Sequence, residues 1–511
     1  MNSSKQISFQ FKQEILAAIV VFLVALPLSL GIAVATGTSP TAGIISAAIG
    51  GIIVGFFAGC PLQVSGPAAG LITIVADIIY QHGFEKLGII VFLAGIIQLL
   101  FAVFRIGPLF RAVAPSVIQG MLSAIGIMIF ASQFHVMVGD VPSRSPFQNL
   151  ISIPGSLFHG LLPMDGSSYH RSAFIGVVTI LTILLWNFAP TKLRKVPAAL
   201  MGVIVSIIIS TFYTLDVGFL EIPDNPFSEI SILNLNNYKE FFTSDILIMA
   251  LTVAFVGTAE TLLTAIAVDK LHTGVRTKFS KEIFAQAMGN MVAGLLGVLP
   301  VSGVIVRSAT NVSAGAKTRL STIMHGVLIL FFIILFPHIL EMIPTSCLAA
   351  ILVYTGVKLV NYKALKKIFS YSKAEFVIYL ITVIAIIQTN LLEGIIIGLV
   401  VSLLRLFQQI NHIKISITRD EHNIEVDLEG AANFVTIPKL ADSLDALEAG
   451  KTVHVFFDNC QYMDHSCIDY LLSWEEQYRS QGGTVELQLH TITDRFSKYR
   501  ETATDEREST K

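Results

Sequence analysis

The chain has 511 residues, of which 53% are hydrophobic and only 14% are charged. This composition excludes an ordinary soluble protein and indicates a membrane protein with several spanning segments. The formal net charge of -2 says little about partners, because the charged residues are segregated along the chain.

Long apolar runs fill the first four fifths of the chain. Lys5 and Lys12 precede the first run, which has no small-residue cleavage site and leads into further runs, so we expect a retained first helix. Fourteen candidate spans follow in order, at residues 14–36, 41–59, 66–80, 87–104, 112–138, 171–189, 197–213, 246–268, 281–299, 303–315, 320–337, 343–360, 374–390 and 393–410.

Basic residues are concentrated in alternate loops between these runs. With a cytoplasmic N-terminus, the loops after even-numbered spans carry Arg105, Arg111, Lys192, Arg194, Lys195, Lys270, Arg276, Lys278, Lys281, Lys317, Arg319, Lys358, Lys363, Lys366, Lys367 and Lys373. The opposite side includes the acidic stretch 214–240, with Asp216, Glu221, Asp224 and Glu229. This positive-inside pattern predicts a multi-pass protein of the inner (plasma) membrane with both termini in the cytoplasm.

Two spans begin with the same interruption. Val64-Ser65-Gly66-Pro67 opens one, and Pro300-Val301-Ser302-Gly303 opens the other, with Arg307 one turn later. About 20 apolar residues are needed to cross a bilayer, and only about half that number follows each Val-Ser-Gly. Paired, interrupted segments point to a binding site at the middle of the membrane. Two facing helix N-termini and an arginine favour an anion there.

The fourteen spans divide into seven and seven. An odd number of spans in each half inverts the second half relative to the first, as an inverted repeat requires. Glycines four residues apart, at Gly51, Gly55 and Gly59 and again at Gly394 and Gly398, predict close helix packing.

The composition changes after Arg405. Strand-like runs at 413–417, 424–428, 452–457 and 484–489 alternate with helical patterns at 437–447 and 467–478. The alternation predicts a small cytoplasmic α/β domain at 412–498, followed by a polar tail at 499–511 that we expect to be disordered. Cys60, Cys347, Cys460 and Cys467 have no disulfide framework spacing and are expected to be reduced.

These features together resemble the SulP family of anion transporters. The resemblance rests on Leu26-Pro27, Ser65-Gly66-Pro67, Glu260 with Thr264, the stretch Arg307-Ser308-Ala309-Thr310-Asn311, and Ala314-Gly315-Ala316-Lys317-Thr318. The C-terminal domain resembles a STAS domain. The resemblance implies an all-α membrane domain at 1–411, with a core of spans 1–4 and 8–11 and a gate of spans 5–7 and 12–14. It also implies elevator-like movement of core against gate, and a homodimer.

Arg307 and Glu260 are the charged candidates inside the membrane. Arg307 either supplies positive potential for the anion or is a structural partner for Glu260 or for helix carbonyls. The resemblance assigns Glu260 and Thr264, one helical turn apart, to cation coupling. A carboxylate, a hydroxyl and carbonyls suit Na+, and the carboxylate could instead bind a proton. A purely structural Glu260 is the alternative.

The anion pocket is expected to consist mostly of backbone. Its predicted residues are Ser65, Ala68, Ala69, Ser302, Gly303, Val304 and Arg307, with Leu28 and Ile32 of span 1 added by resemblance. Ser65 and Ser302 could equally be helix caps. Leu28 stands where some members carry glutamine, which favours the bicarbonate branch of the family.

Ser466 lies between a strand and a helix of the C-terminal domain. In STAS domains that resemble anti-sigma-factor antagonists a phosphoacceptor serine lies at such a turn; the alternative is a simple helix cap. Cys460, His465 and Cys467 have no zinc-site spacing, so no metal is expected beyond Na+ at Glu260.

We therefore expect a secondary active inorganic-anion transporter, of sulfate or bicarbonate class, coupled to Na+ or H+. An uncoupled exchanger or an anion channel of the same family is the alternative. No set of nucleophile, base and oxyanion donors suggests an enzyme, no other cofactor is predicted, and the expected partners are a small anion and lipid, without nucleic acid.

Overall fold

The computed structural model describes residues 2–108, 114–143, 145–161, 168–186, 188–190, 193, 196–223, 225, 230–233, 243–420 and 422–488. Outside these residues lie the predicted loop charges Arg111, Lys192, Arg194, Lys195, Asp224 and Glu229, residues 489–498 of the predicted C-terminal domain, and the tail 499–511. The chain divides into two compact units between Leu399 and Val400, and each unit is described by itself.

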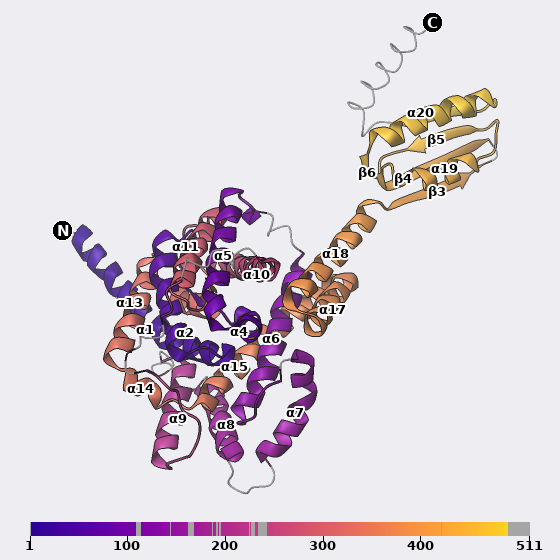
Figure 1. Ribbon diagram of the computed structural model, residues 1–511. Helices are drawn as coiled ribbons and strands as arrows, with labels where there is room; N and C mark the ends of the chain where they lie inside the picture. Colours follow the sequence, from indigo (N-terminus) through magenta and orange to yellow (C-terminus); the bar gives the residue numbers. More distant parts are fainter. Residues whose placement is uncertain are drawn as a thin grey trace. The chain divides into compact units, whose positions relative to one another are not determined.

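The first half of the first unit is almost wholly helical (Figure 1). Its elements are α1 Asn2–Thr36, α2 Pro40–Ile49, the π-helical turn η1 Gly50–Val54, α3 Gly55–Phe57, strand β1 Ser65–Pro67, the 3-10 turn η2 Ala69–Leu71, α4 Ile72–His82, α5 Phe84–Val103, α6 Pro115–Met137, α7 Pro146–Leu161, α8 Ser168–Trp186 and α9 Ala198–Phe212.

The second half of the first unit is also mostly helical, with one short strand, β2, between helices. Its elements are α10 Ser244–Asp269, α11 Phe279–Leu295, β2 Val301–Gly303, α12 Ile305–Ser313, α13 Leu320–Leu335, α14 Pro337–Glu341, α15 Thr345–Leu359, α16 Tyr362–Tyr371, α17 Lys373–Gln388 and α18 Leu391–Ile410, which continues into the second unit.

Among the described residues, eight helical stretches are long and apolar enough to cross a membrane, and three shorter apolar helices accompany them. The chain is therefore a mostly helical membrane protein. Three helices were not predicted from the sequence: α7, α14 and α16 lie in segments that the apolar pattern left as connections.

Close packing at the spaced glycines is confirmed. A Cβ atom on Gly51 would lie 2.7 Å from Cα of Gly326 in α13. Gly394 lies directly against Ile386, which joins α18 to α17. Small residues let these backbones approach each other where lipid provides no hydrophobic driving force between helices.

The second unit carries a small mixed sheet. Its elements are β3 Ile413–Arg419, β4 Asn423–Ala432, α19 Ile437–Asp445, β5 Thr452–Phe456, β6 Cys460–Met463, α20 His465–Ser480 and β7 Thr484–Gln488. The strand order is β3-β4-β5-β7, with β6 also pairing β4, and only the β3–β4 pair is antiparallel.

One face of this sheet forms a core with the helices. Alternate residues of β4 and β5, such as Val426 and Val455, are buried together with Leu440 of α19 and Leu471 of α20. This period-2 burial is what strands covered on one face require. The predicted strands and helices are confirmed where they are described, and β6 is an additional strand.

The crossing of α6 and α15 provides a test of the packing. Gly126→Ala adds a methyl group 2.5 Å from the carbonyl oxygen of Gly356. The two helices must separate, so we expect the free energy of unfolding to fall by about 1–3 kcal/mol. Gly155→Ala in α7 is the matched control, because no atom lies within 4 Å of the added methyl. Equal melting temperatures of the two purified variants in detergent would contradict this packing.

Candidate functional site

The two Val-Ser-Gly copies lie side by side. Strands β1 and β2 are antiparallel, and Ser65 is opposite Gly303 while Gly66 is opposite Ser302. The N–H of Val304 donates to the carbonyl oxygen of Val64 at 3.0 Å and extends the pairing. Segments more than 230 residues apart in the sequence thus meet in one two-stranded ribbon, as the repeated pattern predicts.

Each strand leads into a helix whose N-terminus has no side-chain cap. The residues at the cap positions are Ala68 before η2 and Val304 before α12. Capping by Ser65 and Ser302 is therefore wrong, because Ser65 Oγ accepts from Gln286 Nε2 at 2.7 Å and Ser302 Oγ donates to Glu260 Oε2 at 3.0 Å. Uncapped first-turn N–H groups are the donors that attract an anion.

The predicted apolar lining residues belong to one large buried cluster of the first unit. Leu28 and Ile32 of α1 are buried in the same cluster as Ala68 and Val304. Ala69 is partly exposed and packs against that cluster. Helix α1, which carries Leu28 and Ile32, also packs against α12 and β1.

Arg307 is fully buried, with 0% of its surface exposed. Its Nη2 donates to Ser29 Oγ of α1 at 2.9 Å, and its Nη1 lies directly against Gly66, where a Cβ atom would collide with it. Among the described residues, Nε and Nη1 have no hydrogen-bond partner and no carboxylate forms an ion pair with the guanidinium. Pairing of Arg307 with Glu260 is therefore wrong.

Glu260 lies within α10 and faces Gly70, the middle residue of η2. A Cβ atom on Gly70 would lie 2.9 Å from Glu260 Oε2, so only glycine allows the carboxylate this close to the backbone. The other contact of the carboxylate is the Ser302 hydroxyl. Glu260 therefore bridges the two interrupted segments, touching Gly70 in the middle of η2 and Ser302 in the middle of β2.

Two threonines of α10 hold β2 by its last residue. Thr261 Oγ1 accepts from the N–H of Gly303, and Thr264 Oγ1 donates to the carbonyl oxygen of Gly303, both at 3.0 Å. The hydroxyl proton of Thr264 is used in this bond, which leaves its oxygen lone pairs as the only ligands it could offer to a cation.

A polar stripe on α11, missed in the sequence, holds the rest of the ribbon. Asn290 exchanges two hydrogen bonds with the backbone of Val301, at 2.7 and 3.0 Å. Gln286 donates to Ser65, and Glu282 accepts from the N–H groups of Gly59 and Cys60 at 2.8 Å each. The signal was available, because Glu282, Gln286 and Asn290 recur every four residues on one helix face.

The polar side chains of α10 and α11 that bond the two strands are here called the brace. Two residues of α12 add to this brace around β1. Ser308 Oγ accepts from the N–H of Val64 at 2.9 Å, and Asn311 Nδ2 donates to the carbonyl oxygen of Leu62 at 3.0 Å. The brace therefore comes from α10, α11 and α12 together.

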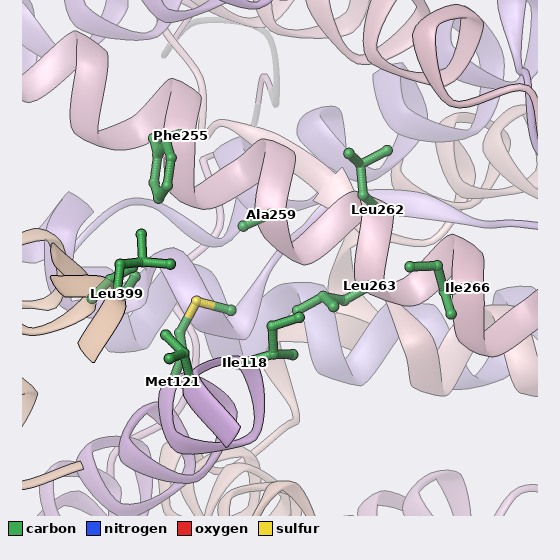
Figure 2. A pocket seen from close by; sticks show the side chains of 10 residues that line it. Ile118, Met121, Phe255, Ala259, Leu262, Leu263, Ile266 and Leu399 are labelled. Carbon is green, nitrogen blue, oxygen red and sulfur yellow. The ribbon is translucent and has the colours of Figure 1, made fainter. Parts of the chain in front are cut away.

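An apolar cavity of about 30 Å³ lies beside α10, near Glu260 in sequence but lined only by hydrocarbon and one thioether. In Figure 2 the side chains of Met121 and Leu399 are directed toward α10, where Ala259 leaves space. Its lining comes from α6, α10 and α18: Val117, Ile118, Met121, Phe255, Ala259, Leu262, Leu263, Ile266, Ile395 and Leu399. Without a polar donor, this cavity is not suited to an anion.

Ser466 is exposed at the start of α20. The cap of this helix is Asp464, whose side chain accepts from the N–H of Cys467 at 2.9 Å, so the interpretation of Ser466 as the cap is wrong. Burial raises the pKa of the Cys467 thiol to about 12, helped by the neighbouring Asp464. A thiol held in its protonated form is a poor metal ligand.

Comparisons with known proteins agree with this architecture. A putative sulfate transporter of Bacillus subtilis, YvdB, is 28% identical over 89% of the chain and 87% of its own length. The bicarbonate transporter BicA of a Picosynechococcus strain is 24% identical over 72% of the chain and 65% of its own length.

Two solved structures share the fold. The transmembrane domain of a cyanobacterial BicA superposes with a TM-score of 0.63 at 22% identity, covering 77% of this chain and 97% of that one. The murine anion transporter Slc26a9 superposes with a TM-score of 0.77 at 15% identity, covering 95% and 87%. The model of the sulfate permease family matches residues 11–382. The chain belongs to the sulfate permease family.

Proposed function

We propose that this protein is a secondary active transporter of a small inorganic anion, of the sulfate or bicarbonate class. The observation that carries the proposal is Arg307, a buried guanidinium with two nitrogens that have no partner among the described residues. A buried charge is costly unless it is compensated, and intramembrane arginines mark ion pathways. An anion bound beside β1 and β2 supplies the missing compensation.

The substrate is small because little besides backbone can bind it. The uncapped ends at Ala68 and Val304 offer N–H donors, whereas the adjoining Leu28 and Ile32 offer none. Bicarbonate or sulfate can be held by a few N–H groups and one guanidinium. The bicarbonate and sulfate transporters among the relatives give the same substrate classes.

Coupling to a cation is assigned to Glu260, with Thr264 as a second ligand. The carboxylate contacts both interrupted segments, so a Na+ ion or proton bound there changes the charge next to both strands. An uncoupled exchanger or channel needs no such carboxylate. The retained acid favours coupling, with the choice between Na+ and H+ left to experiment.

Movement is proposed to be of the elevator type, with fourteen spans as two inverted sets of seven. The apolar cavity supports this, because it lies where α10 of the proposed core faces α6 and α18 of the proposed gate. A boundary without hydrogen bonds can slide with little cost. Also proposed are cytoplasmic termini, a homodimer, a STAS-type C-terminal domain and Ser466 as its phosphoacceptor.

The experiment that tests the function is uptake of labelled bicarbonate, sulfate, chloride and a small dicarboxylate into proteoliposomes, with and without a Na+ gradient. We expect saturable uptake of bicarbonate or sulfate. The other anions should inhibit this uptake only if they bind at the same site. Absence of uptake for every anion in a correctly folded preparation would contradict the proposal.

Arg307→Ala removes the positive charge from the proposed site. Loss of a charge-assisted contact of about 1.5–3 kcal/mol predicts uptake that is lower by on the order of tenfold to a hundredfold. Arg307→Lys keeps the charge and should retain part of the activity. Arg319→Ala, which removes a partly exposed arginine that bonds Phe56, is the control. Unchanged uptake by Arg307→Ala would remove the main support of the proposal.

Thr261→Val tests whether the brace sets the geometry of the site. The N–H of Gly303 loses its acceptor, which is expected to cost about 1–3 kcal/mol of stability and to lower the apparent anion affinity. The matched control is Thr252→Val on the same helix, because that hydroxyl bonds only the carbonyl of Ile248 in its own turn. Equal effects of the two substitutions on melting temperature and uptake would speak against the brace.

Glu260→Gln tests coupling, because glutamine keeps the shape but not the charge. We expect uptake that no longer responds to a Na+ or proton gradient. Glu282→Gln is the control for loss of a buried carboxylate, since Glu282 bonds the backbone of Gly59 and Cys60; it should lower stability and leave the gradient response in place. A Glu260→Gln protein with the full response would rule out this coupling site.

A further inference from the structure

Helix α16 combines a basic face with an apolar one. Its N-terminus is capped by Asn361, whose side chain accepts from the N–H of Ala364. Lys363, Lys366 and Lys367 lie at helical spacing on one face, and Leu365 and Phe369 lie on another. Such a helix is typical of one that lies in a membrane interface.

The apolar face anchors the helix only in part. Leu365 packs against the buried apolar cluster, and the ring of Phe369 contacts Phe376 of α17 at 5.0 Å between centroids. No residue of α16 is buried, and Tyr362 and Tyr371 at its two ends are 73% and 89% exposed. Tyrosines with an apolar body and a polar tip favour the headgroup level of a bilayer.

The charge on this segment is not neutralised within the chain. From residue 342 to residue 374 there are five lysines and no aspartate or glutamate. Among the described residues, no ion pair involves Lys363, Lys366 or Lys367. Their cationic face is therefore available to an anionic partner.

Chain connectivity keeps α16 at the membrane surface. The apolar stretch Thr345–Tyr371 begins with α15 and continues through α16, and only Ser372 separates α16 from α17. Phospholipid headgroups are thus always within reach. We propose that α16 binds anionic phospholipid headgroups through Lys363, Lys366 and Lys367, with Tyr362 and Tyr371 seated among the lipids. The inference needs only that the chain spans a membrane and does not depend on which anion is transported.

The acidic second unit is the alternative anionic partner for the three lysines of α16. In residues 412–488 aspartate and glutamate outnumber lysine and arginine, so this unit also has the charge to meet the lysines. Lipid is favoured because the exposed tyrosines suit a bilayer interface and because α16 is joined directly to the apolar helices α15 and α17.

The test uses the full chain with Ser370→Cys, an exposed position on the basic face, labelled with an environment-sensitive fluorophore. Cys460→Ser removes the partly exposed thiol, and the remaining cysteines are buried. The protein is reconstituted in phosphatidylcholine vesicles with increasing phosphatidylglycerol. We expect the fluorescence to change saturably with the mole fraction of phosphatidylglycerol. For the triple variant Lys363→Gln/Lys366→Gln/Lys367→Gln we expect the midpoint of this change at a phosphatidylglycerol mole fraction on the order of tenfold higher.

Two matched variants sharpen the result. Replacing the same three lysines by arginine keeps the charge and should leave the midpoint unchanged. Glutamine at Lys270, Lys278 and Lys281, three exposed lysines elsewhere, removes equal charge and should also leave it unchanged. A wild-type midpoint in the α16 glutamine variant, or an equal shift in the Lys270/Lys278/Lys281 variant, would overturn the proposal.

Two further measurements separate the sources of negative charge. Inorganic phosphate added to phosphatidylcholine vesicles should not reproduce the signal, and a full response to it would overturn the lipid assignment. If the α16 glutamine variant in vesicles without anionic lipid released the second unit, seen as faster hydrogen exchange in β3 to β7, that unit would be the partner and the proposal would be wrong.

Discussion

The buried guanidinium of Arg307 is the constraint on which the rest of this site depends. It is fully enclosed, it bonds Ser29, and within the described part of the chain no carboxylate neutralises it. A charge in such a place is destabilising by several kcal/mol, so its surroundings must hold it in position. Gly66 is part of that requirement, since any side chain there would occupy the space of Nη1.

The ribbon beside Arg307 cannot be stable by itself. Each strand has three residues, and isolated two-stranded pairs are marginal even in water. The brace solves this by bonding backbone groups to side chains, as Asn290 does for Val301 and Ser308 does for Val64. At membrane depth each unsatisfied backbone group is costly. The same bonds that satisfy the strands therefore fix where the two uncapped helix ends point.

The sequence predicted the meeting of the two segments because a short pattern, Val-Ser-Gly, occurred twice beside truncated apolar runs. A lone arginine or glutamate in an apolar span also drew attention to Arg307 and Glu260, whose roles in anion binding and cation coupling stay predictions. The sequence did not predict which group each hydroxyl would bond. Ser65 and Ser302 were equally compatible with caps, and only the fold puts Gln286 and Glu260 next to them.

Two other features of the structure were not predicted from the sequence, each for a different physical reason. The α11 stripe of Glu282, Gln286 and Asn290 has helical spacing, but it lies inside the predicted span 281–299, where the surrounding apolar residues dominate the pattern. Helix α16 lies in a lysine-rich connection between two predicted spans. The lysines were interpreted as a sign of the cytoplasmic side of the membrane, and the helical spacing of the apolar residues among them was overlooked. In the C-terminal unit, Asp464 and not Ser466 caps α20. Aspartate and serine both suit a helix cap, so the choice depends on the residue at which the helix begins, which the sequence does not fix.

Polar and apolar surfaces are divided sharply on α10. One side of the helix bonds β2 through Thr261 and Thr264, and Glu260 contacts Ser302. The neighbouring side, at Ala259 and Leu263, faces the cavity against α6 and α18 without a polar group (Figure 2). Hydrogen bonds are directional and resist displacement, whereas apolar contacts are not directional. The proposed elevator-type movement requires directional bonds within the moving domain and non-directional contacts at its boundary, and α10 has contacts of both kinds.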